Sequence, residues 1–291
     1  MTLGRKPVYV IFGHGGVIGT ALLRVLSAKA EDFRIFAFDH ARADITNADH
    51  VNHLLDYIKP TIVFNCAGIS DPDICEEAKA GAFRINGVGP AILAKACFRS
   101  GVRLVHFSSW GVLDGKNVHA QTEKAPTSPQ SAYGQSKLHG EQCCLISCPS
   151  SVVIRVGWVF GEDREGKISE WVSNAERRLN IRVLKDIIGS PIYVDDLADA
   201  ACFLATTETR GIFNVANQGK VTWEDFAKKT ISLCKLPLSL VTSYKAEKAN
   251  LPKNCCLSCK KYNDLSKKTL RPWEDALKEC LFHMNRYTPE E

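Results

Sequence analysis

Short apolar runs alternate with longer amphipathic stretches through the first 160 residues of the chain. Runs of five to eight residues with the composition of buried strands lie at 8–12, 34–39, 61–67, 102–109 and 151–157. Between them, helical spacing of apolar positions predicts helices at 18–30, 48–58, 86–101 and 133–146. Because parallel strands need such crossovers, the alternation predicts an α/β fold with a doubly wound parallel sheet.

The pattern becomes less regular after Gly157. Helical spacing returns at 167–179, 196–205 and 223–234, and a short apolar run at 211–216 predicts one more strand. Turn signals interrupt residues 236–268, where no element is predicted. We therefore expect a smaller C-terminal region that forms one wall of a cleft.

Several glycines follow the first predicted strand. Gly13, Gly16 and Gly19 have the spacing that permits a tight turn, the approach of backbone to a pyrophosphate, and close helix packing. An ordinary strand-to-helix turn is the alternative interpretation. The pattern predicts a Rossmann-like dinucleotide site made by Gly13, His14, Gly15, Gly16, Val17, Ile18 and Gly19.

This site suggests how the chain is divided. The dinucleotide-binding domain is predicted to comprise residues 1–157 and 188–216, and the smaller substrate-binding region residues 158–187 and 217–291. The small residues Cys66, Ala67 and Gly68 end the third predicted strand, where they would let a cofactor lie across the sheet edge. Tight packing explains them equally well.

Asp39 ends the second predicted strand, 20 residues after Gly19. A carboxylate at this position accepts hydrogen bonds from the adenosine ribose and repels the extra phosphate of NADP. Arg42, three residues later, would instead suit that phosphate. The sequence thus predicts NAD(P)H as cofactor and favours NAD(H).

Tyr133 and Lys137 lie four residues apart in a predicted helix, so their side chains share one face. A nearby ammonium favours the phenolate and lowers the pKa of a tyrosine from about 10. Most such pairs are only a packed ring and a solvated amine. Here Ser109 ends the fourth predicted strand and brings a hydroxyl to the same sheet edge, which predicts proton transfer to a carbonyl oxygen.

Composition narrows the class of protein. The net charge of +5 arises partly from lysines scattered through the C-terminal third, which are typical of a solvated face, so no nucleic-acid partner is predicted. No apolar run reaches the roughly 20 residues of a membrane span, and no signal peptide is recognised, so a cytoplasmic protein without membrane contact is expected. The twelve cysteines are then reduced thiols. Cys255, Cys256 and Cys259 offer half of a zinc site but no second pair, so no metal is predicted.

Taken with these residues, further motifs give the chain a family resemblance. It resembles an extended short-chain dehydrogenase/reductase over nearly its entire length, and within that superfamily the dTDP-4-dehydrorhamnose reductase family, which also includes the regulatory β subunit of methionine adenosyltransferase. The matching segments are Asp44-Ile45-Thr46, Asp73-Ile74-Cys75-Glu76, Ser108 to Gly115, Arg155 to Gly161, Asp186 to Pro191, and Arg271 to Leu277.

The resemblance implies reduction of the 4-keto group of a nucleotide-linked 6-deoxysugar by NAD(P)H. Tyr133 would donate the proton, Ser109 would bind the carbonyl oxygen, and Lys137 would hold the nicotinamide ribose and tune Tyr133. It also implies that Asp44 and Ile45 lie near the adenine and that Trp158 packs against the sugar nucleotide. Without the resemblance, Trp158 is equally well explained as a core aromatic.

The chain departs from the family pattern beside these groups. Trp110 and Gly111 replace an Asp-Tyr pair, Ile187 replaces a Gln, and Leu251 replaces an Arg. The sugar pocket therefore differs from that of the family. Two other functions stay open: an NDP-sugar epimerase of the same superfamily, and a non-catalytic nucleotide-binding regulatory subunit. A homodimer is the default expectation for the assembly.

Overall fold

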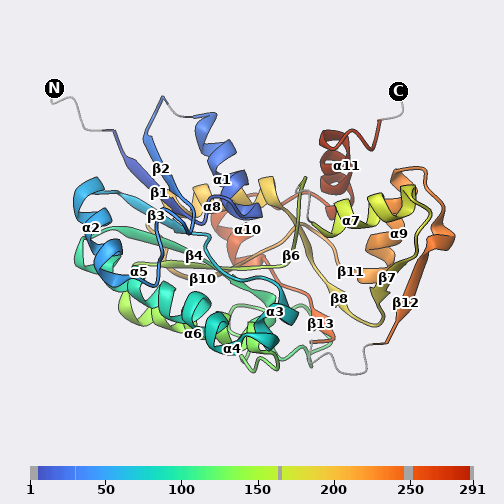
Figure 1. The fold of residues 1–291 in the computed structure, drawn as a ribbon, viewed down its shortest axis with the longest axis horizontal. Helices are drawn as coiled ribbons and strands as arrows, with labels where there is room; N and C mark the ends of the chain where they lie inside the picture. Colours follow the sequence, from blue (N-terminus) through green and yellow to red (C-terminus); the bar gives the residue numbers. More distant parts are fainter. Residues whose placement is uncertain (1–5, 30, 163–165, 246–251, 289–291) are drawn as a thin grey trace.

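The computed structural model describes residues 6–29, 31–162, 166–245 and 252–288. Its centre is a six-stranded, wholly parallel sheet in the order β10-β5-β4-β3-β1-β2 (Figure 1). The strands are β1 Val8–Phe12, β2 Arg34–Phe38, β3 Ile62–Asn65, β4 Arg103–Ser109, β5 Val152–Val156 and β10 Gly211–Val215. The chain crosses to the other side of β1 after β2, which places the topological switch point between β1 and β3.

Register brings the carboxyl ends of the strands together. Phe12 pairs with Asn65 between β1 and β3, and Ser109 pairs with Val156 between β4 and β5. In an open parallel sheet, ligands bind outside these strand ends. The glycine turn after β1 and the serines at the end of β4 thus open on the same edge.

Helices cover both faces of the sheet. One face carries α2 Ala48–Ile58, α5 Gly89–Arg99 and α6 Ala132–Ser147, and the other carries α1 Val17–Ser27 and α8 Val194–Thr206 (Figure 1). Val10, Leu55, Leu93 and Leu104 are buried between the sheet and the first group of helices. Because β1, β3 and β5 have buried residues on both faces, their sequences are continuous apolar runs.

The predicted fold class is confirmed. The five strands predicted before residue 160 form with ends within two residues of those expected, and the predicted strand at 211–216 becomes β10 at the sheet edge. The predicted helix at 86–101 is interrupted at its start, where residues Arg84–Val88 form a π-helical turn, η1, ahead of α5. Two short helices, α3 Pro72–Glu77 and α4 Lys79–Phe83, precede it and were not predicted.

The C-terminal region is built from short strands and amphipathic helices. Its strands form small sheets, β6 with β9, β7 with β12, and β11-β8-β13. The bounds are β6 Trp158–Phe160, β7 Ile181–Leu184, β8 Ile188–Gly189, β9 Pro191–Tyr193, β11 Val221–Thr222, β12 Val241–Tyr244 and β13 Asn254–Cys255. The helices are α7 Lys167–Glu176, α9 Trp223–Leu233, α10 Lys260–Ser266 and α11 Trp273–His283, with a 3₁₀ turn, η3 Leu238–Leu240. A second 3₁₀ turn, η2 Trp110–Val112, directly follows β4 of the large sheet.

The predicted division into two domains is compatible with this arrangement and stays a prediction. The large sheet draws its strands from residues 8–156 and 211–215, while the small sheets lie between residues 158 and 255. One apolar cluster nevertheless runs from the large sheet through α8 into α7, α9 and α11. Among the described helices, none is long and apolar enough to cross a membrane.

Candidate active site

Close contacts fix the conformation of the glycine turn after β1. Gly13 has φ +78°, and its N–H and that of His14 donate to the carbonyl of Phe38 at 2.8 and 3.2 Å. A Cβ on Gly13 would lie 2.5 Å from the Ala67 nitrogen, and one on Gly19 would lie 2.2 Å from the Gly13 carbonyl oxygen. Gly13 therefore excludes a side chain because of both its positive φ and the close approach of Ala67. Gly19 excludes one because of close approach alone.

The other two glycines have no close steric contact, since a Cβ on Gly16 would lie 3.6 Å from the Gly13 carbonyl oxygen. A Cβ on Gly15 would have no atom within 4 Å, and Gly16 is the N-cap of α1 without a side chain that caps it. The first turn of α1 includes Val17, Ile18 and Gly19 and carries no acidic residue. Free N–H groups at a helix N-terminus beside an open glycine turn fit a pyrophosphate.

The adenosine side of the predicted cofactor site lies along β2 and the following turn. Asp39 comes directly after β2, partly buried, and its Oδ1 accepts the Arg42 N–H at 2.9 Å. Asp44 Oδ1 accepts both the N–H and the hydroxyl of Thr46 at 2.8 Å, which lowers the pKa of Asp44. Ile45 is buried against the start of α5.

The turn after β3 connects the glycine turn to the predicted catalytic lysine. The Cys66 N–H donates to Phe12, and Ala67 lies against Gly13 as described above. A Cβ on Gly68 would lie 2.9 Å from Asn86 Oδ1 and 3.8 Å from Lys137 Nζ. Cys66, Ala67 and Gly68 are thus packed between the predicted cofactor and proton-transfer groups, as expected for small residues at a strand end.

Ser109 and Tyr133 meet at the end of β4. Both side chains border Gly111, whose N–H donates to Ser109 Oγ at 3.0 Å. The Tyr133 ring lies over Gly111, where a Cβ would be 3.1 Å from Tyr133 Cε1. A methyl group at this position would require the ring to shift by a few tenths of an ångström.

Lys137 reaches the same sheet edge one helical turn later but contacts a different group. Its side chain is 8% exposed, and its ammonium donates to the carbonyl of Phe107 at 2.5 Å. Burial lowers the pKa of Lys137 to about 8. The pKa of Tyr133 is raised by burial, with an opposing contribution from the Ser109 hydroxyl, whereas the sequence predicted a lowered value. Desolvation of the phenol outweighs its favourable contacts, because Lys137 faces Phe107.

Two sets of contacts that the sequence analysis did not predict anchor α6. Glu76 on α3 accepts the Ala132 N–H at 2.6 Å, at the first turn of the helix. Further along, Glu141 forms an ion pair at 2.5 Å with Arg155 on β5, and Ser108 donates to Glu141 at 2.8 Å. The glutamate and arginine side chains are each only 2% exposed. Helix α6 is therefore fixed on both sides of Lys137, to α3 before it and to the sheet after it.

Asn86 is another residue that the sequence analysis did not single out. It lies in the π-helical turn, fully buried, where its amide donates to the Ile69 carbonyl at 2.9 Å and to the Ser136 hydroxyl at 3.1 Å. Its Oδ1 accepts the Ile69 N–H at 2.8 Å. The available signal was an asparagine inside an otherwise apolar helical pattern; such π-helical turns often occur at functional sites.

Trp158, the predicted substrate contact, lies in the core. It is 4% exposed and stacks on Trp223 with ring centroids 4.2 Å apart, and its ring covers Gly189. Ile187, expected near the sugar, is also buried. Trp110 is only partly buried, beside Ser109. The core-aromatic interpretation of Trp158 therefore fits this geometry, and its contact with substrate stays a prediction.

The cysteines at 255, 256 and 259 do not converge. Cys255 and Cys259 donate to the carbonyls of Pro252 and Ala216, at 3.2 and 3.7 Å. In the described part of the chain, the one group of potential metal ligands close together is Glu162, Asp195 and His283. There the Arg24 guanidinium pairs with both carboxylates, so the protein itself supplies the cation.

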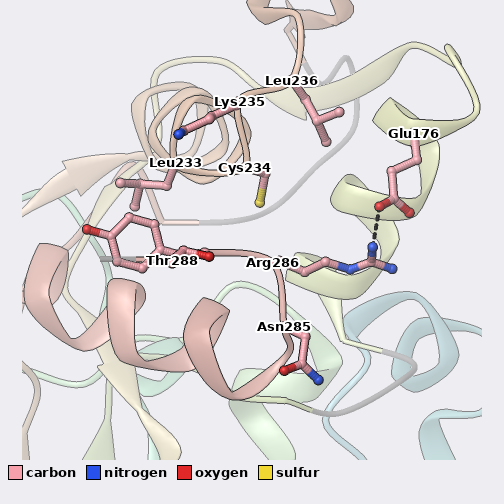
Figure 2. Close-up of a pocket in the computed structure, with 9 residues that line it drawn as sticks. Glu176, Leu233, Cys234, Lys235, Leu236, Asn285, Arg286 and Thr288 are labelled. Atoms are coloured by element: carbon pink, nitrogen blue, oxygen red, sulfur yellow. Dashed lines mark hydrogen bonds and ion pairs between the residues drawn. The ribbon is translucent and has the colours of Figure 1, made fainter. Parts of the chain in front are cut away.

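A cavity of about 290 Å³ lies apart from these residues, where three helices end (Figure 2). It is lined by Glu176 at the end of α7, by residues 233–236 at the end of α9, and by residues 285–288 after α11. Arg286 and Glu176 form an ion pair across it. None of the predicted site residues lines this cavity, so it is separate from the candidate active site.

The fold and this edge of the sheet define a class of protein. A parallel sheet with an open glycine turn after its first strand, and with Ser109, Tyr133 and Lys137 gathered at the end of its fourth, is that of an extended short-chain dehydrogenase/reductase. A family model described as RmlD substrate binding domain matches residues 8–286. The chain belongs to that family, which confirms the resemblance to the dTDP-4-dehydrorhamnose reductases.

Relatives in this family span almost the whole chain. A spore coat polysaccharide biosynthesis protein, SpsK of Bacillus subtilis, is 30% identical over 274 residues, covering 94% of this chain and 96% of its own. The dTDP-4-dehydrorhamnose reductase of Mycobacterium tuberculosis is 33% identical over 240 residues, 79% and 77% of the two chains. The crystal structure of the Bacillus anthracis dTDP-4-dehydrorhamnose reductase in complex with NADP has a TM-score of 0.91 at 28% identity, covering 96% and 99%.

Proposed function

We propose that the protein is an NAD(P)H-dependent oxidoreductase that reduces the 4-keto group of a nucleotide-linked 6-deoxysugar, a dTDP-sugar in the first instance. The observation that carries the proposal is the grouping of Ser109 and Tyr133 around Gly111, with Lys137 on the same helix, at the strand ends adjoining the open glycine turn. Relatives that cover most of the chain are named as reductases of such sugars. A relative whose structure is similar binds NADP.

The residues of this chain have separable roles in the proposed reaction. The α1 N-terminus and Gly13 to Gly16 would hold the pyrophosphate, and Lys137 would hold the nicotinamide ribose. When bound there, the reduced nicotinamide would supply hydride to the carbonyl carbon. Ser109 would donate a hydrogen bond to the carbonyl oxygen, and Tyr133 would give that oxygen its proton.

Protonation state favours Tyr133 as a donor. Burial raises the pKa of the phenol, so the neutral form holds its proton until charge develops on the substrate oxygen. The phenol ring and Ser109 Oγ both border Gly111, so the two hydroxyl groups would approach one carbonyl oxygen together. A donor placed in advance lowers the barrier without reorganisation during the reaction.

The identity of the sugar depends on residues that depart from the family pattern. Trp110 puts an indole beside Ser109 where the family has an acidic residue, and Gly111 removes a phenol. These changes favour a substrate that is less polar at this side than the usual one. The Leu251 position, the third departure, lies outside the described residues.

A panel of dTDP- and UDP-linked 4-keto-6-deoxysugars, assayed for NADH and NADPH oxidation by absorbance at saturating cofactor, tests the proposal. We expect oxidation with at least one dTDP-sugar and product reduced at C4 by NMR. Cofactor binding with no oxidation on any sugar would contradict the reductase function and favour the regulatory subunit. Interconversion of C4 epimers with tightly held NAD and no net NADH consumption would favour the epimerase.

The homodimer and the cytoplasmic location stay predictions. Gel filtration with light scattering tests the first, and cell fractionation tests the second.

A further inference from the structure

A buried histidine sits under the strand ends and has no part in the proposed chemistry. His106 on β4 is 0% exposed and pairs in register with Asn65 on β3. Its Nδ1 lies 3.1 Å from the side-chain nitrogen of Asn65. Its Nε2 is also buried, without a hydrogen-bond partner in the described part of the chain. A buried polar atom left unpaired is costly, so stability alone does not account for this residue.

Backbone chemistry fixes the direction of each hydrogen bond. The Ala67 N–H can only donate, so the Asn65 atom that it contacts at 3.2 Å is the amide oxygen. The remaining Asn65 atom is then the NH₂ group, which donates to His106. His106 Nδ1 must therefore be an acceptor, which makes the imidazole neutral with its proton on Nε2. Burial, assisted by the charge of Lys137, lowers the pKa of His106 well below its usual value, in agreement with the neutral form.

The next contact connects this pair to the cofactor turn. Ala67 is the residue whose backbone lies against Gly13, at 2.5 Å from where a Cβ would be. Ala67 and Gly68 also lie between the glycine turn and Lys137. A shift of the Ala67 backbone therefore changes the shape of the surface that faces the dinucleotide.

We propose that His106 is a positioning residue for the dinucleotide site: it orients Asn65, which holds Ala67, whose backbone sets the glycine turn at Gly13. The inference rests on the proposed function only in its use of NAD(P)H. It assigns His106 no contact with the cofactor and no step in proton transfer. Its consequence is confined to the affinity and placement of the dinucleotide.

Two variants separate the hydrogen bond from packing. His106→Asn places an acceptor oxygen near the Nδ1 position but leaves a void, and His106→Phe fills the volume but cannot accept. We measure Kd for NADH and NADPH by calorimetry on the full chain without sugar, and the melting temperature by circular dichroism. We expect His106→Phe to raise Kd by about threefold to tenfold, the range for one neutral hydrogen bond, and His106→Asn to stay within about twofold.

A larger increase in Kd for His106→Asn than for His106→Phe would overturn the inference. It would show that Kd depends on side-chain volume, and that the histidine contributes only packing. Unchanged Kd in both variants would overturn it too.

Leu104→Ala is the matched control, two residues earlier on the same strand and fully buried. It should lower the melting temperature and leave Kd unchanged. In an Asn65→Ala background, His106→Phe should have no further effect on Kd, and an additive effect would contradict the proposed order of contacts. Because no sugar is present, failure of the ketone reduction leaves this test intact.

Discussion

The Lys137 ammonium donates a hydrogen bond of 2.5 Å to the Phe107 carbonyl, so the helix residue is tied to the strand that ends in Ser109. This contact stabilises a charge in a buried place, and burial still lowers the pKa of Lys137 to about 8. The side chain therefore titrates near physiological pH. Its charge state, and not only its position, becomes part of how the site works.

Cofactor affinity should therefore depend on pH. The fraction of charged Lys137 falls as the pH rises through about 8, so the ammonium that we expect to bind the cofactor ribose would be lost above that value. We expect the Kd of NADH in calorimetry to rise by about threefold to tenfold between pH 7 and pH 9. Lys137→Met should bind weakly at both values, and a variant that keeps the pH dependence would show that another group causes it.

Tyr133→Phe removes the proton donor and almost nothing else. The ring still lies over Gly111, so the packing of the turn is kept. We expect kcat to fall by at least about 100-fold, the range of general acid catalysis, with Kd for NADH within about twofold of the parent. Progress curves at saturating sugar and calorimetry give the two numbers. Substantial turnover by this variant would assign the proton to another group.

Gly111→Ala tests the fit between the turn after β4 and the tyrosine. The new methyl group would lie 3.1 Å from Tyr133 Cε1 and 3.4 Å from Ser109 Oγ, so it would push the two hydroxyl groups apart. We expect kcat to fall by about tenfold to 100-fold with little change in KM for NADH. Gly81→Ala is the control: it lies in α4 with no atom nearer than 3.9 Å, and should leave kcat unchanged. Normal kcat in Gly111→Ala would show that Tyr133 can adjust.

The buried pair of Glu141 and Arg155 should dominate the stability of the β4–α6–β5 unit. Glu141→Gln leaves the arginine charge without its partner in a place that is 2% exposed, so we expect the free energy of unfolding in urea to fall by about 3–5 kcal/mol. Lys260→Ala removes an ion pair of which both members are well exposed, and should cost less than about 1 kcal/mol. Similar losses in the two variants would contradict this difference.

Asp39 should set the choice between NADH and NADPH. Its carboxylate follows β2 and accepts the Arg42 N–H, so its charge is held where the adenosine ribose is expected. We expect Asp39→Ser to shift the ratio of kcat/KM values toward NADPH by about tenfold, which is about 1.4 kcal/mol. Arg42→Ala should shift the ratio of kcat/KM values toward NADH if that guanidinium binds a 2′-phosphate. An unchanged ratio in Asp39→Ser would place the determinant elsewhere.

The elements differ in how accurately the sequence predicts their bounds. Val8–Phe12 was predicted to the residue, because a strand buried on both faces is a continuous apolar run that the following glycines end sharply. The start of α5 was mistaken, because a π-helical turn at Arg84–Val88 leaves the apolar spacing almost unchanged. Segment 236–268 gave no prediction, since its elements are short and contact residues far away in sequence.

The sequence by itself determined the parallel sheet, the glycine turn, and the placing of Tyr133 and Lys137 on one helix face, since each depends on residues close together in the chain. Only the tertiary structure decided that Lys137 faces Phe107, that burial raises the pKa of Tyr133, and that Trp158 stacks on Trp223 in the core. It also revealed His106 and Asn65 behind the cofactor turn. Desolvation and contacts between neighbouring strands depend on which distant segments cover a residue, and local periodicity does not carry that information.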